Sequence, residues 1–151
     1  GTKLDGGGIV KGVFADELAA ALGRHRAFVI DCCGDLRLGG TDRATREVHV
    51  ESPFDGSVVH TFELARGGVA TSGIGRRAWI GPDGAPAHHL LDPATGRAAF
   101  TGVTQVTALA PTATEAEMRS KAALLSGPAG AAQWLPHGGV VVLDDGSHVS
   151  I

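Results

Sequence analysis

The sequence contains no tyrosine, and aromatic residues make up only 5% of its 151 positions. We therefore expect a core built mainly from Ala, Val and Leu, because few large rings are available to fill it. No apolar run approaches the roughly 20 residues that a membrane-spanning helix needs, and the N-terminus lacks the apolar region of a secretory signal peptide. The sequence predicts neither a membrane span nor a targeting signal.

An excess of charge of either sign is also missing. The formal net charge is −3 and the pI is about 6.1, so no strongly basic surface is expected and nucleic acid is excluded as a partner. Hydrophobic residues make up 43% of the chain and charged residues 19%, which is typical of a soluble globular protein. A chain of this length can bury roughly 70% of its unfolded surface, which predicts one domain over residues 1–151.

Cysteine is scarce, and the two cysteines are neighbours, Cys32 and Cys33. Adjacent cysteines cannot reach ordinary disulfide geometry without distorting the peptide between them, so we expect reduced thiols. No C-x-x-C spacing exists, which gives a zinc site on sulfur no support. Reduced cysteines favour a cytoplasmic location, while an exported form stays open if a signal precedes Gly1.

Glycine is abundant, at 23 residues, and marks many of the expected turns. A glycine-rich loop over residues 4–12 leads into a helix over residues 13–24, in which Phe14, Leu18 and Leu22 share one face. Thr112 or Thr114 can cap a second helix over residues 115–126, and a weaker helix follows at 129–135. Strands are expected at 27–30, 48–50, 58–64, 69–71, 79–80, 103–109, 140–143 and 149–151, several of them in hairpins. The fold class is therefore α+β, a single domain with a largely antiparallel sheet packed with helices.

Three clusters of residues could carry chemistry, and each also has an ordinary structural explanation. The glycines before Lys11 could present backbone N–H groups and an ammonium to a phosphate, although such a loop is more often a tight turn. His89 lies near Asp92 in a segment that also favours a turn, and an imidazole beside a carboxylate can move protons near neutral pH. Glu117 and Lys121 are spaced as a surface ion pair of an exposed helix.

Taken together, short motifs from these clusters occur in an order that resembles the ApbE family of FAD:protein FMN transferases. The motifs are Leu4-Asp5 with the glycines, Ile9-Val10-Lys11-Gly12 and Asp16 that follow, Gly34-Asp35, residues 70–73, residues 89–96, and residues 116–127. The resemblance covers nearly the whole chain but only the C-terminal half or so of a typical member. It implies an ApbE-like domain, related to the T-fold, that lacks the usual N-terminal part.

The resemblance implies that the protein binds FAD and that a threonine hydroxyl of an acceptor protein attacks the phosphate on the FMN side, releasing AMP. His89, Asp92 and Lys121 would then be catalytic residues, with His89 as the proton acceptor. The nucleotide would be bound by Gly7, Gly8, Lys11, Thr71, Ser72, Gly73 and Thr95. Two alternatives stay open: an FAD pyrophosphatase that yields FMN and AMP, and a catalytically degenerate module that binds flavin or another protein.

The resemblance also implies a magnesium site built from Gly8, Glu117 and Ser120, and here the sequence departs from the family. Glu117 stands where the family has Asp, and Lys121 where it has Thr. A protonated lysine has no lone pair for a metal and repels a cation, so it could replace the ion instead. Ile74 also replaces the acidic or polar residue that often follows the Thr-Ser-Gly motif.

Overall fold

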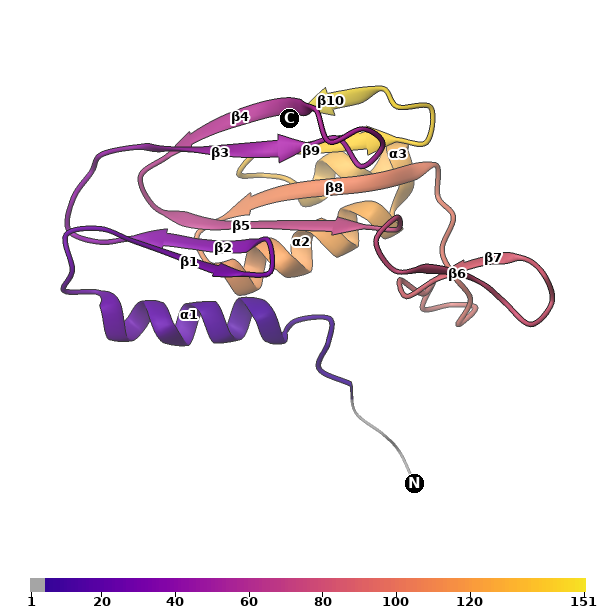
Figure 1. The fold of residues 1–151 in the computed structure, drawn as a ribbon, viewed down its shortest axis with the longest axis horizontal. Helices are drawn as coiled ribbons and strands as arrows, with labels where there is room; N and C mark the ends of the chain where they lie inside the picture. The colour runs from indigo at the N-terminus through magenta and orange to yellow at the C-terminus, as the bar shows by residue number, and fades with distance from the viewer. Residues whose placement is uncertain (1–4) are drawn as a thin grey trace.

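The computed structural model describes residues 5–151, so Leu4 of the first motif lies outside the described residues. These described residues form two long helices, two short ones and ten strands (Figure 1). In chain order these are α1 (Val10–Leu22), β1 (Phe28–Cys32), β2 (Asp35–Gly39), β3 (Arg46–Glu51), β4 (Val58–Leu64), β5 (Gly67–Gly73), β6 (Ala78–Ile80), β7 (Pro86–His88), β8 (Val103–Ala110), α2 (Ala113–Leu125), α3 (Gly127–Gly130), the 3-10 helix η1 (Ala131–Trp134), β9 (Gly139–Leu143) and β10 (His148–Ser150).

Six strands form one antiparallel sheet in the order β1-β2-β5-β8-β9-β10. Strands β3 and β4 form a second sheet, a two-stranded hairpin, and β6 and β7 form a third, smaller one. The expected α+β class with a largely antiparallel sheet is confirmed. The strand over Asp35–Gly39 was not expected, because its glycines at both ends indicated turns.

The domain has three layers, with α1 and α2 on one face of the sheet and the β3–β4 hairpin on the other (Figure 1). Side chains of β5 and β8 alternate between the two faces: Ala70 lies against Ala116 of α2, whereas Val69 lies with Val48 of the hairpin. The core is rich in small and branched aliphatic residues, as the lack of aromatic residues predicts.

Helix α1 begins three residues earlier than expected and buries a different face. Phe14 and Leu18 are exposed, with 57% of Phe14 accessible, while Gly12, Ala15 and Ala19 are buried. The expected face was wrong because the helix lies close against its neighbours, where small side chains fit and large ones do not. At Gly12 an added methyl group would come within 2.6 Å of the α2 backbone.

Helices α1 and α2 run antiparallel and cap each other. Asp16 of α1 accepts hydrogen bonds from the N–H groups of Ala113 and Thr114, at 3.0 and 2.9 Å, at the start of α2. Glu117 of α2 accepts one from the N–H of Gly12, at 2.8 Å, in the first turn of α1. Each carboxylate satisfies donors that a helix N-terminus leaves unpaired. Within α2, the Thr112 hydroxyl also accepts from the N–H of Glu115, as expected for one of the two candidate caps.

The segment between β5 and β8 carries the small β6–β7 hairpin, with Trp79 paired to Ala87, and lies beyond one end of the main sheet (Figure 1). The predicted turn at residues 82–84 joins these two strands, and Gly84 adopts a φ of +78° there. His88 is the last residue of β7 and His89 follows it, so this hairpin determines where both imidazoles lie.

Candidate functional site

The glycine-rich loop begins α1 and directs Lys11 towards the sheet. The carbonyl of Gly6 accepts hydrogen bonds from the N–H groups of Ile9 and Val10, both at 3.0 Å, and this turn starts the helix. Lys11, in the first turn, places its Nζ 2.7 Å from Oδ2 of Asp35. The loop therefore supplies an ammonium group at the edge where β2 begins.

Asp35 is a buried carboxylate, with 2% of its surface exposed. Its Oδ1 accepts a hydrogen bond from the N–H of Thr71, at 3.3 Å. Burial raises the pKa of Asp35, Lys11 acts against this, and the negative charge of Glu117 raises the pKa further. The sequence indicated Asp35 only as part of a turn and of the Gly34-Asp35 motif, with no role of its own, so its pairing with Lys11 was missed.

A second carboxylate and ammonium lie on α2. Glu117 is 1% exposed, and its Oε1 lies 2.9 Å from Nζ of Lys121, which is 23% exposed. Its Oε2 accepts from the N–H of Gly12. The expected i,i+4 pair is present, but its carboxylate is buried at the junction of two helices while its ammonium stays partly exposed.

Gly8 connects this pair to the loop. A methyl group added at Gly8 would lie 3.9 Å from Cε of Lys121. The glycine loop and the middle of α2 are therefore side by side, which is the arrangement that the implied site of Gly8 and Glu117 requires. Gly7 lies in the same turn, where its N–H donates to Asp5 at 2.8 Å.

Sheet alternation divides the Thr71-Ser72-Gly73 motif between the two faces. Ser72 faces α2, where its hydroxyl lies 2.8 Å from that of Ser120 in a buried contact. Thr71 faces the opposite way, with its hydroxyl 2.8 Å from that of Thr107. Of the three motif residues, only Ser72 therefore points its side chain into the layer that contains Glu117.

His89 is exposed at the end of β7, within range of several cations. Partial burial of its ring lowers the pKa of His89, and the charges of Arg77, Lys121 and Lys11 lower it further, against a backbone hydrogen bond at Arg77. A neutral imidazole able to accept a proton is therefore favoured at neutral pH. Arg77 was not anticipated as a neighbour, because its position depends on how the β5–β6 connection folds.

The other members of the histidine motif have structural partners. His88 is buried and its ring meets Phe100 edge-on, with centroids 4.6 Å apart. Asp92 accepts hydrogen bonds from the N–H of Ala94 and the hydroxyl of Thr95, both at 2.9 Å. This turn fixes the loop after His89, so the ordinary explanation accounts for the contacts of Asp92 and Thr95.

Comparison with known proteins agrees with this arrangement. The sequence model of the ApbE family matches residues 1–143. The chain belongs to the ApbE family. A FAD:protein FMN transferase of Treponema pallidum (strain Nichols) is 30% identical over 144 residues, covering 84% of this chain and 39% of that protein.

Solved structures show the same ApbE fold. The ApbE protein of Thermotoga maritima superposes with a TM-score of 0.84 at 30% identity, covering 97% of this chain and 50% of that one. The apo flavinyl transferase ApbE of Pseudomonas stutzeri gives a TM-score of 0.73 at 24% identity, covering 99% of this chain and 49% of that one. The chain thus spans about half the length of these ApbE relatives, or less.

The magnesium ion implied by the ApbE resemblance does not fit the residues present. Both oxygens of Glu117 already have partners, and the hydroxyl of Ser120 is buried against Ser72 and the carbonyl of Glu117. The ammonium of Lys121 lies where it would repel a divalent ion. Within residues 5–151, no group of three His, Cys, Asp or Glu side chains is placed to hold a metal.

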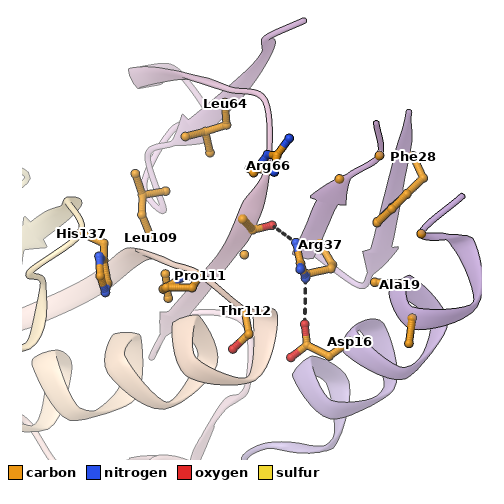
Figure 2. A pocket seen from close by; sticks show the side chains of 17 residues that line it. Asp16, Ala19, Phe28, Arg37, Leu64, Arg66, Leu109, Pro111, Thr112 and His137 are labelled. Carbon is orange, nitrogen blue, oxygen red and sulfur yellow. Dashed lines mark hydrogen bonds and ion pairs between the residues drawn. The ribbon is translucent and has the colours of Figure 1, made fainter. Parts of the chain in front are cut away.

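A separate groove of about 760 Å³ lies at the opposite end of α1 (Figure 2). It shares no residue with the site of Lys11, Glu117 and Lys121. Figure 2 shows Arg37 bridging Asp16 and a backbone carbonyl, that of Gly67, at 3.0 and 3.2 Å. These contacts fasten α1 to the sheet, which gives Asp16 of the first motif a structural role.

None of the helices formed by residues 5–151 is long and apolar enough to cross a membrane. Cys32 and Cys33 are both free, and Cys33 has a φ of +57° in the turn between β1 and β2. This turn delivers Asp35 to the start of β2.

Proposed function

We propose that this chain contributes to the transfer of FMN from FAD to a threonine hydroxyl of an acceptor protein, with release of AMP. The observation that carries the proposal is that Lys11 and Lys121, each paired with a buried carboxylate, lie beside the glycine loop of an ApbE fold, where their charges also lower the pKa of His89. The activity of the Treponema pallidum relative, FAD:protein FMN transferase, supports the same chemistry.

In this reaction the acceptor hydroxyl oxygen forms a bond to the phosphorus on the FMN side, and the bond from that phosphorus to the AMP oxygen breaks. The ammonium groups of Lys11 and Lys121 would offset negative charge on the diphosphate. His89, held neutral by its surroundings, would take the hydroxyl proton, and AMP leaves with the bridging oxygen. Gly7 and Gly8 let the backbone approach the phosphates closely.

The acceptor is expected to dock beside His89. Trp79 and Ile80 of the β6–β7 hairpin are exposed and precede His89 by a single turn and strand. Exposed apolar side chains next to a reactive group suit a protein substrate better than water. Ser72 and Thr95 would border the flavin nucleotide. The free cysteines favour a cytoplasmic location for this reaction.

The test is incubation of the protein with FAD, with and without a threonine-containing acceptor peptide, followed by chromatography for AMP and mass spectrometry of the peptide. Transfer gives AMP and a peptide that has gained FMN. AMP with free FMN would show a pyrophosphatase instead, and neither product would show a binding module. The last two outcomes each refute the proposal.

A further inference from the structure

Glu117 is a buried carboxylate whose two oxygens are both engaged from within the chain. Oε2 accepts from the Gly12 N–H at 2.8 Å, and Oε1 lies 2.9 Å from the Lys121 ammonium. Such a group needs a positive partner, because an unpaired buried carboxylate is costly. In this chain a lysine of the same helix supplies that charge.

The Lys121 ammonium is also placed where a ligand could use it. Its stem lies under Gly8 of the loop, and 23% of the side chain remains exposed. Lys11 repeats the arrangement with Asp35, at 2.7 Å, and remains 39% exposed. The site thus holds two fixed monovalent cations, each backed by a buried carboxylate and each open to solvent on its outer side.

We propose that Lys121 takes the place of a divalent cation in this site, so that the diphosphate is bound without magnesium. The part that concerns FAD rests on the proposed function. The part that concerns the metal does not, because it depends only on the contacts of Glu117 and Lys121.

The metal is tested first, with no flavin present. MgCl2 is titrated into the protein by calorimetry, and Mn²⁺ binding is followed by electron paramagnetic resonance. We expect no saturable binding. One ion bound with a Kd of about 1 mM or tighter, the range of weak protein cation sites, overturns the proposal.

Lys121→Thr removes the ammonium and adds a hydroxyl oxygen, so this variant should gain saturable Mn²⁺ binding. The matched control is Arg119→Met, which removes the cation of the other i,i+4 pair of α2, Glu115–Arg119 at 2.7 Å. It should bind no more Mn²⁺ than the wild type. A folded Lys121→Thr protein that binds no Mn²⁺ would show that Lys121 is not what excludes the ion. Circular dichroism checks that the variant is folded. If it is unfolded, the wild-type titration alone decides the proposal.

FAD binding is then measured by flavin fluorescence, in EDTA and in MgCl2. The wild-type affinity should be the same in both, and Lys121→Met should weaken it about tenfold, the effect of one charge-assisted contact, while Arg119→Met does not. Binding that requires MgCl2 refutes the inference and leaves the proposed function standing. No FAD binding in either buffer refutes the proposed function, and the Mn²⁺ titration still decides the inference.

Discussion

Replacing Asp16 by Asn should lower stability measurably, because one carboxylate holds α1, α2 and β2 together. It accepts from Ala113, from Thr114 and from Arg37. Asn keeps the shape but offers a single oxygen and no charge. Loss of a helix cap, of the charge at the helix N-terminus and of a part-exposed ion pair adds up to about 2 kcal/mol.

The measurement is urea unfolding followed by circular dichroism. With a slope of about 2 kcal/mol per molar urea, the midpoint of Asp16→Asn should fall by about 1 M. The control is Glu17→Gln on the exposed side of the same helix. The side chain of Glu17 makes no hydrogen bond or ion pair among residues 5–151. Equal midpoints for the two variants would refute the capping role.

The same variant gives a pH test. Burial opposes the charged form of Asp16, but hydrogen bonds from Thr114 and Ala113 and the charge of Arg37 outweigh it, so its pKa lies below the ordinary value of 3.8. The stability it adds is therefore complete above about pH 4 and is lost as the pH falls through the lower, folded-state pKa. The difference in unfolding free energy between wild type and Asp16→Asn should shrink at acid pH. A difference that stays constant down to about pH 2 would mean that the charge of Asp16 plays no part.

Three further predictions concern the site and the core. His89→Gln should slow AMP release by about 10²- to 10⁴-fold with little change in FAD affinity, and unchanged turnover would exclude His89 as the base. The wild-type rate should fall only below pH 6.5, because the lowered pKa of His89 keeps the ring neutral down to that range. Gly12→Ala should cost about 1–3 kcal/mol of unfolding free energy because the new methyl group meets the α2 backbone, whereas Gly75→Ala enters open space and should be neutral. Leu124→Ala, fully buried, should cost about 3 kcal/mol in urea unfolding and the exposed Leu91→Ala much less.

Elements with local signals were predictable from the sequence. Thr112 precedes a helical stretch, and its hydroxyl caps α2. The turn before β10 places Gly146 at a φ of +84°, as a short hairpin turn with glycine predicts. In both cases a few neighbouring residues contain all the information that the element needs.

Elements that depend on distant partners were not predictable. The exposed side of α1 carries Phe14 and Leu18, which a hydrophobic pattern assigns to the core. The buried side is set by how closely α2 approaches, a distance that no local pattern encodes. β2 is a different case: its flanking glycines hid it, although it pairs with the adjacent β1 across a short turn as well as with β5, about 30 positions away.

The candidate site divides in the same way. The ApbE resemblance implied that the loop at Gly8 and the helix at Lys121 lie side by side, because the implied cation site draws on both, and they do. Asp35 was missed because its importance comes from burial and from Lys11, neither of which is visible in a turn motif. The split of Thr71 and Ser72 between faces follows from strand alternation, and the register of β5 decides which one faces α2.

Helices α1 and α2 each supply a carboxylate that caps the other, and this affects how the domain opens. Asp16 and Glu117 join segments 97 and 105 residues apart in the sequence. Each helix has N–H groups in its first turn that find an acceptor only when the other helix is docked, so the two should protect these amide protons from exchange as one cooperative unit. Lys11 and Lys121 both extend from this unit. The two ammonium groups should therefore be held in the site together and released from it together, so that a partly opened molecule holds both or neither.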